Sequence, residues 1–299
     1  MLALGAARAP RAHAAPTGPG VGQTARYSLS VRVIVREDSA DATETAALIQ
    51  TAHVTLEPIA QEDDGGLIVR GRFDRLTAVW RRGDEQLEFI WPRDDAPALG
   101  AAPEAPIVDE ALSPSEAFAA VFEATAAQPF ELIVSADGQV VSVRGLTAEA
   151  RAQASGMVDP AAVGMLRPAR FAAIVQPIFD AGGLPMGRLA PWTRTRVEPM
   201  GAAGAVTIVT AWRPVEGEEG RVEAEASATI TVAPRDPASD GQPVFELTRA
   251  EGEGALVWSA QAGLQAWSET LVIGGRWSVG DIQARLSVRS ERAVRRIED

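Results

Sequence analysis

The segment Val222–Val232, with the sequence VEAEASATITV, alternates apolar and polar side chains without a break. A period of two is typical of a β-strand with one buried face, because successive side chains point to opposite faces of a sheet. The same rhythm runs from Tyr27 to Val35 and from Ala46 to Leu56. The sequence therefore predicts a mainly β (α+β) protein whose strands each present one apolar face.

Glycine-containing turns separate further segments of this kind. Gly65-Gly66 and Gly83-Asp84 precede two apolar-rich segments, and such pairs are typical of turns between strands. We therefore expect strands over residues 67–80 and 87–91. Gly274-Gly275 is interpreted as another turn.

The C-terminal segment fits two structures. Ala284, Leu286 and Val288 alternate as in a strand, whereas Ile282, Leu286 and Ala293 also fit one face of a helix. We expect a closing strand that runs to about Arg289.

Two parts of the chain resemble each other. Residues 51–58 (TAHVTLEP) align without a gap with residues 227–234 (SATITVAP), and the spacing from Gly22 to Tyr27 recurs from Gly187 to Trp192. Any two β-hairpins share some of this pattern, so chance likeness is the alternative. We interpret the similarity as an internal duplication that gives two related curved antiparallel sheets, or half-barrels. The two units are expected in residues 21–92 and 187–299.

Residues 93–186, which join these units, have a different sequence pattern. Residues 94–109 are rich in Pro and Ala and are interpreted as a linker. Ser113 followed by Pro114 and Glu116 is typical of a helix N-terminus with a capping box. Asp137-Gly138 between two apolar runs predicts a hairpin, and a second helical stretch is expected from Thr147, resuming over residues 167–179. The insert is therefore predicted to be helix–hairpin–helix.

The composition excludes several kinds of chemistry. The chain of 299 residues has no Cys and no Lys, so it offers no disulfide, no Cys-ligated metal, no Schiff-base Lys and no P-loop. Its formal net charge of −12 disfavours nucleic acid as a partner, because phosphates require cationic cover. With two His residues, we expect no metal site and no cofactor.

Residues 1–20 are rich in Ala, Pro and Gly and are not expected to join the core. Ala12-His13-Ala14 before Ala15 has the small-x-small form of a signal-peptidase site, although the apolar segment before it is short. These residues are either a disordered tail or the remainder of an export signal, and we favour the second. We therefore expect an exported protein, periplasmic or extracellular, without a transmembrane helix.

Three motifs carry a resemblance: Gly22 with Tyr27, residues 130–140 (FELIVSADGQV), and Gly187 with Trp192. They resemble a loosely defined group of uncharacterised exported bacterial β-rich proteins over most of residues 21–297. The resemblance implies large curved sheets and carries no known activity or site residue. Such sheets are loosely similar to periplasmic carriers that hold a lipid or lipoprotein chain in a half-barrel capped by helices.

Signals for catalysis are sparse. His53 lies out of phase with apolar Val54, so we expect it on the polar face of its strand. No G-x-S-x-G motif is present. A carboxylate-dependent hydrolase would need two inward-facing acids in one cleft, and the candidates would be Glu57, Asp74 and Glu88.

Seven Trp residues against one Tyr is the unusual enrichment of this chain. These Trp side chains either fill a wide, curved core, which we favour, or form a ligand surface for sugar rings or lipid chains. The sequence pattern does not place Trp258 and Trp267 both inside.

These patterns together favour a non-enzymatic protein. We expect it to bind an apolar small molecule, a lipid or a partner protein between a curved sheet and the helices of the insert. The candidate ligand contacts are Phe118, Phe122, Phe171 and Ile178 on the helices and Trp192 on the sheet. The alternatives are a structural or adhesion-like surface protein with a filled core, and the carboxylate-dependent hydrolase.

Overall fold

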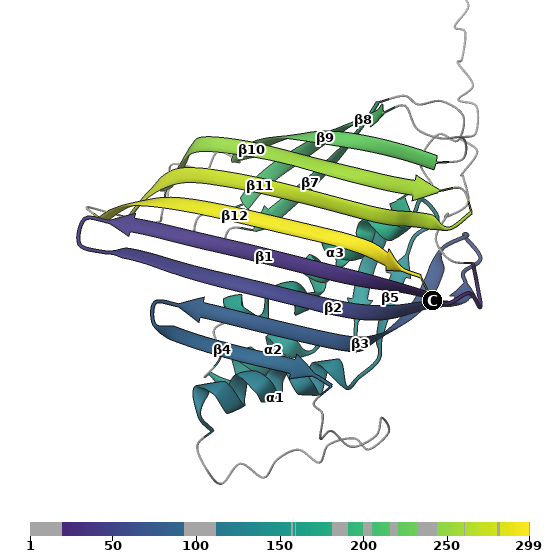
Figure 1. Ribbon diagram of the computed structural model, residues 1–299, viewed down its shortest axis with the longest axis horizontal. Helices are drawn as coiled ribbons and strands as arrows, with labels where there is room; N and C mark the ends of the chain where they lie inside the picture. The colour runs from purple at the N-terminus through teal and green to yellow at the C-terminus, as the bar shows by residue number, and fades with distance from the viewer. Residues whose placement is uncertain are drawn as a thin grey trace, which may run out of the picture.

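Antiparallel strands make up most of the molecule. The computed structural model describes residues 20–92, 112–156, 158, 160–180, 191–199, 205–215, 221–232, 244–259, 261–279 and 282–298. Within these ranges the strands form a 12-stranded sheet, and the helices lie on one of its faces (Figure 1). The mainly β fold with a helical insert is thus confirmed.

The first part of the chain is a meander of long strands, as the alternation predicts. Its strands are β1 (Ala25–Ser39), β2 (Thr43–Gln61), β3 (Leu67–Arg82) and β4 (Glu85–Trp91). The insert then supplies α1 (Pro114–Ala126), β5 (Phe130–Val134), β6 (Val140–Arg144), α2 (Ala148–Ser155), the 3-10 helix η1 (Pro160–Leu166) and α3 (Pro168–Asp180). The expected linker at 94–109 lies outside the described residues.

The last part of the chain is a second meander. Its strands are β7 (Trp192–Pro199), β8 (Ala205–Val215), β9 (Arg221–Val232), β10 (Val244–Ser259), β11 (Gly263–Val279) and β12 (Ile282–Ile297). The C-terminal segment is therefore a strand rather than a helix, and it runs past the expected end at Arg289.

The two expected sheets are joined into one. The strand order is β6-β5-β3-β2-β1-β12-β11-β10-β9-β8-β7, with β4 also paired to β3. β1 and β12 pair along nearly their whole length, from Arg26 opposite Ile297 to Ser39 opposite Ala284. This pairing places the first and the last strand side by side in the middle of the strand order, and local alternation carries no information about it.

The duplication stays a prediction. The alignment of residues 51–58 with 227–234 matches β2 with β9, and therefore β1 with β8. The Gly-aromatic spacing instead matches β1, which carries Tyr27, with β7, which begins at Trp192. The two similarities assign different counterparts to β1, and Gly187 lies outside the described residues.

The start of α1 follows the sequence pattern. The backbone N–H of Glu116 donates to Ser113 Oγ, and the backbone N–H of Ser113 donates to Glu116 Oε2 at 2.8 Å, which completes a capping box. Pro114 stands in the first turn, where its missing N–H costs nothing. The helix ends at Ala126, shortly before Pro129.

The hydrophobic core lies between the helices and the inner face of the sheet. Leu29, Ala52 and Val54 on neighbouring strands are fully buried. A polar side chain, Gln50, is also fully buried, and it is satisfied: its Oε1 accepts from the backbone N–H of Met165, and its Nε2 donates to the Val163 carbonyl at 3.1 Å. Gln50 thereby fixes η1 against β2.

The interpretation of Gly274-Gly275 as a turn was wrong. Both glycines lie inside β11, paired with β10. A Cβ atom on Gly275 would lie 2.3 Å from the Phe245 ring, so the missing side chain makes room for an aromatic ring on the neighbouring strand.

Tyr27 provides a pH-dependent test of this core. Its side chain is 1% exposed, and burial raises the pKa of its hydroxyl to about 12, with a smaller opposing effect from the charge of Arg296. Between about pH 10 and pH 12 the unfolded chain loses this proton while the folded chain keeps it. The free energy of unfolding is therefore expected to fall across this range by about 3 kcal/mol.

Because the chain has a single Tyr, its tyrosinate absorbance reports on Tyr27 alone. We expect a titration midpoint near 12 in the folded protein, moving to about 10 in urea. The Tyr27→Phe variant is the control and should lose both the absorbance change and this part of the alkaline destabilisation. A folded-state midpoint near 10 would contradict the burial of Tyr27.

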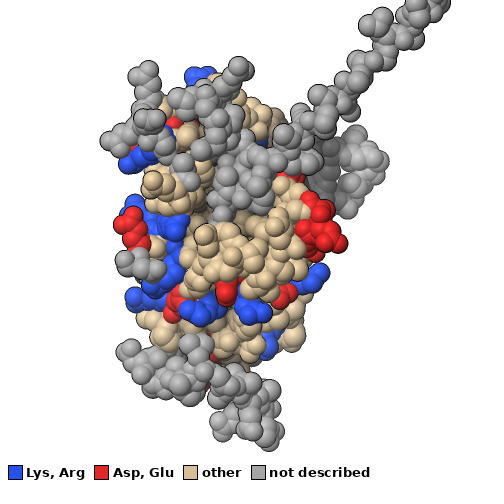
Figure 2. Space-filling view, turned by 90° about the vertical axis from the view of Figure 1, so that its right-hand side faces the viewer, with Lys and Arg blue, Asp and Glu red and all other residues tan. Residues whose placement is uncertain are grey.

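No helix in the described part of the chain is long and apolar enough to cross a membrane. The face of the molecule drawn in Figure 2 carries both Arg and acidic side chains, with a region free of charged side chains between them. This face therefore carries charges of both signs, although the net charge of the chain is negative.

Candidate functional site

One face of β7 carries an aromatic side chain followed by three charged ones. Trp192, Arg194, Arg196 and Glu198 are all half-buried, while Thr193, Thr195 and Val197 between them are exposed. A period of two places these four side chains on the same face of the strand. That face is turned toward the interior of the curved sheet.

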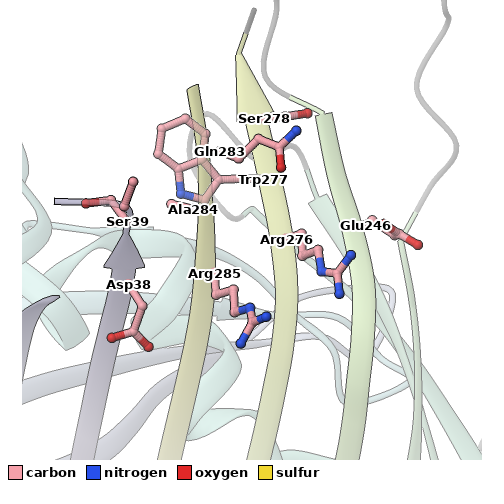
Figure 3. A pocket seen from close by; sticks show the side chains of 10 residues that line it. Asp38, Ser39, Glu246, Arg276, Trp277, Ser278, Gln283, Ala284 and Arg285 are labelled. Atoms are coloured by element: carbon pink, nitrogen blue, oxygen red, sulfur yellow. The ribbon is translucent and has the colours of Figure 1, made fainter. Parts of the chain in front are cut away.

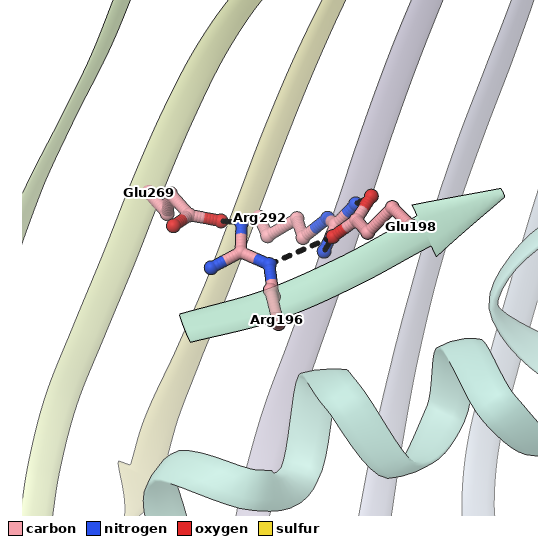
Figure 4. Close-up of polar contacts among 4 residues, drawn as sticks. All are labelled: Arg196, Glu198, Glu269 and Arg292. Atoms are coloured by element: carbon pink, nitrogen blue, oxygen red, sulfur yellow. Dashed lines mark hydrogen bonds and ion pairs between the residues drawn. The ribbon is translucent and has the colours of Figure 1, made fainter. Parts of the chain in front are cut away.

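An ion network ties β7 to distant strands. Arg292 of β12 donates to both carboxylate oxygens of Glu198 at 2.6 Å, and Arg196 Nε donates to Glu198 Oε1 at 2.8 Å. Arg196 Nη2 also contacts Oε2 of Glu269 on β11. Figure 4 shows β7 lying over the strands that carry these partners. Because four strands separate β7 from β12 in the sheet order, the sheet curls back upon itself.

The network shifts the ionisation of its members. Burial by itself would raise the pKa of Glu198, but the charge and hydrogen bonds of Arg292, with those of Arg196, lower it to about 2. Burial lowers the pKa of Arg194 to about 10, with a further contribution from the nearby charge of Arg196. Glu198 is therefore fully ionised at neutral pH and is a poor proton donor.

Glu269 has an unsatisfied oxygen. Its side chain is 3% exposed, and no donor among the described residues reaches Oε1, although Oε2 is held by Arg196. A buried carboxylate oxygen without a partner costs free energy, which makes the position an attractive one for a hydrogen-bond donor from outside the chain.

All of these inward-facing residues except Glu198 line two neighbouring cavities, which we call the α3–β7 groove. The larger cavity has about 440 Å³ and the smaller about 240 Å³. The larger is lined by Asp137, Gln139, Pro177, Asp180, Trp192, Thr193, Arg194, Thr195, Trp212, Leu256 and Trp267. Five residues line both cavities, namely Gln139, Pro177, Arg194, Thr195 and Trp267, and Glu269, Arg196 and Arg292 line the smaller one.

The larger cavity combines aromatic faces with fixed polar groups. The rings of Trp192 and Trp212 are nearly parallel, with centroids 5.9 Å apart. Asp180, at the end of α3, forms an ion pair with Arg194 and accepts a hydrogen bond of 2.7 Å from Gln176 Nε2. Apolar faces beside a few oriented polar groups are typical of a small-molecule site.

The structure separates the five predicted ligand contacts. Phe118, Phe122 and Phe171 have no exposed surface, and Ile178 is 1% exposed. These four side chains fill the core between helices and sheet and line neither cavity. Trp192 does line the larger cavity, so of the five it is the one placed in the groove.

The predicted carboxylate candidates lie on separate strands, and two of them contact side chains of their own strands. Asp74 on β3 accepts from Arg72 Nε at 3.1 Å, and Glu88 on β4 contacts Gln86. Glu57 lies on β2 and is half-buried. His53 is also half-buried, beside Ala52 and Val54, which point into the core, and this agrees with its expected place on the other face.

Two expectations about Trp have clear outcomes. Trp258 and Trp267 are 2% and 5% exposed, so both lie inside, which the sequence pattern did not establish. Trp267 fits both interpretations of the Trp enrichment, core filling and a ligand surface, because it belongs to the hydrophobic core and also lines the groove.

A further cavity of about 620 Å³ lies at the ends of β1, β10, β11 and β12 (Figure 3). Its wall carries a row of charges in register across these strands: Asp38 opposite Arg285, Arg285 opposite Arg276, and Arg276 opposite Glu246. An acid flanks each Arg, so cross-strand pairing accounts for this row without a ligand.

The residues that sequence reasoning missed are Arg194, Arg196, Glu198, Glu269 and Arg292. The signal for them was present, because each stands in the inward phase of its strand. Glu269 lies between Trp267 and Leu271, and Arg292 precedes Val294 by two residues. A charged residue in such a position predicts an ion pair across the core. Among the described residues, no group of three or more His, Cys, Asp or Glu is placed to hold a metal ion.

Fold and groove together define a mainly β protein with a curled antiparallel sheet, a helix-filled interior and a Trp-lined cavity. No family model matches the chain, and no curated protein matches its sequence. A structure titled "Lipid-protein interactions in lipovitellin" is similar at 11% identity with a TM-score of 0.42, over 93% of this chain and 25% of that chain. This chain thus spans about a quarter of the length of that one.

Two further solved structures are less similar. DynF from the dynemicin biosynthesis pathway of Micromonospora chersina has 8% identity and a TM-score of 0.18, over 93% of this chain and 82% of that one. OpdQ of Pseudomonas aeruginosa has 7% identity and a TM-score of 0.19, over 89% of this chain and 66% of that one. Similarity at these levels assigns neither a family nor a function.

Proposed function

We propose that this protein is a non-catalytic binding protein that takes a small molecule with an aromatic or apolar part into the α3–β7 groove. The observation that carries this proposal is the larger cavity, where three Trp side chains and Leu256 face fixed polar groups. Its volume of about 440 Å³ is within the range of small-molecule sites.

The proposal relocates the ligand that the sequence predicts. The space between the helices and the inner face of β1–β3 is filled by side chains such as Phe118 and Phe171, so a ligand there would have to displace them. The groove offers existing space beside that core. A lipid stays among the ligands to test, because its chain would lie against the Trp faces.

A hydrolase is the weaker candidate. Glu198 and Glu269 both face the interior and both contact Arg196, which is the kind of carboxylate pair that such an enzyme needs. However, a pKa of about 2 keeps Glu198 ionised, so it has no proton to give to a leaving group. The expectation of export is a proposal too, since residues 1–19 lie outside the described part.

The test is a titration with N-phenyl-1-naphthylamine, a neutral aromatic probe, followed by quenching of Trp emission. We expect saturable binding in the micromolar range and about a tenfold weaker affinity in Trp192→Ala. Trp277→Ala, which removes a half-buried Trp outside the groove, is the matched control and should bind as the wild type does. The absence of a saturable change at micromolar probe would refute the proposal.

A further inference from the structure

The polar side chains that line the groove, in addition to its Trp rings, limit the kind of ligand that can bind there. Glu269 is the decisive group, because this residue lines the smaller cavity and no donor among the described residues reaches its buried Oε1. A ligand that reaches this cavity gains most if it donates a hydrogen bond there, from a hydroxyl, an amide or an ammonium group.

The charges around Glu269 distinguish among these donors. Arg196 touches its carboxylate, and Arg194 and Arg292 line the same cavity. An ammonium group would have to share the Glu269 carboxylate with the guanidinium group of Arg196, and the two cations would repel each other there.

An anionic head group is disfavoured because the Arg side chains of the groove already have carboxylate partners. Each of the three Arg side chains has a carboxylate partner: Asp180 for Arg194, Glu269 and Glu198 for Arg196, and Glu198 for Arg292. Three acids thus balance three Arg, and an anion would have to break an existing ion pair to gain a partner of its own.

A neutral hydroxyl group avoids both costs. It can donate to Glu269 Oε1 and accept from an Arg or Gln side chain on the same wall, because each hydroxyl is both donor and acceptor. Gln139 and Gln176 line the smaller cavity and offer further amide groups. The Trp faces of the larger cavity then receive the apolar part of the same ligand.

We propose that the ligand of the α3–β7 groove carries a neutral, hydroxylated head group, as in a sugar or a glycerol, that donates a hydrogen bond to Glu269. This inference rests on the proposed function of the groove. It adds the class of head group and the residue that recognises it.

The experiment compares three amphiphiles with the same octyl chain by titration calorimetry: octyl β-glucopyranoside, octylammonium and octyl sulfate, each below its micelle-forming concentration. We expect the glucoside to bind about tenfold more tightly than either charged amphiphile. Glu269→Gln should remove most of this preference, while Glu251→Gln, on an exposed part of β10, should keep it. A preference ratio is insensitive to a general loss of stability, so a merely structural role of Glu269 would leave it unchanged.

Three results would overturn the inference: equal or tighter binding of a charged amphiphile, an unchanged preference in Glu269→Gln, or no heat from any of the three. If none of them binds while the naphthylamine probe still binds at Trp192, the head-group inference fails alone. If the probe does not bind either, the proposed function fails with it.

Discussion

Replacing Phe171 by Ala is expected to lower the free energy of unfolding by about 3–5 kcal/mol. Phe171 has no exposed surface, and its ring centroid lies 5.0 Å from that of Phe130 and 5.9 Å from that of Phe73. Truncation removes these contacts and leaves a cavity between α3 and the sheet. Urea unfolding followed by Trp emission measures the change.

The matched control is Val141→Ala on β6, where the side chain is 62% exposed and the expected change is within about 0.5 kcal/mol. This comparison separates two roles that the sequence left open for Phe171. A loss below about 1 kcal/mol, together with weaker binding of the naphthylamine probe, would show that Phe171 lines a ligand space rather than the core.

The second large effect is expected from the buried ion network. Glu198→Ala removes the bidentate partner of Arg292, whose side chain is 12% exposed, and leaves that guanidinium group without its main compensation. Breaking a buried pair from one side typically costs about 3–5 kcal/mol. The exposed pair Arg249–Glu251 is the control, and Glu251→Ala should cost at most about 1 kcal/mol.

The pH dependence of the same pair has a defined sign. The folded pKa of Glu198, about 2, is below that of the unfolded chain, so its stabilising contribution is present above about pH 4.5 and is lost as the pH falls toward 2. Glu198→Ala should flatten this part of the acid unfolding curve. A variant with the wild-type acid dependence would show that another group controls it.

The local pattern of the sequence was sufficient for most individual elements. Alternation identified β9 and β2, the Ser113–Glu116 capping box identified the start of α1, and Asp137-Gly138 identified the hairpin between β5 and β6. Each of these signals acts within a few residues of the chain. Local chemistry therefore determines them almost completely.

The groove could not be predicted in the same way, because its walls come from distant segments. Pro177 on α3, Trp192 on β7, Leu256 on β10 and Trp267 on β11 meet through the curl of the sheet. Alternation tells which side chains share a face of a strand, but it does not tell which strands face one another. The long pairing of β1 with β12 is a second contact of this kind.

The most direct test of the account is site-specific protection in the groove. The chain has no Cys, so Gln139→Cys, at an exposed position that lines both cavities, and Thr229→Cys, on an exposed part of β9, each provide a single thiol. The measurement is the rate of alkylation by a maleimide with and without saturating naphthylamine probe. We predict that the probe slows the reaction at position 139 about tenfold or more and leaves position 229 unchanged. Equal rates with and without probe at position 139 would contradict the claim that the groove is the binding site.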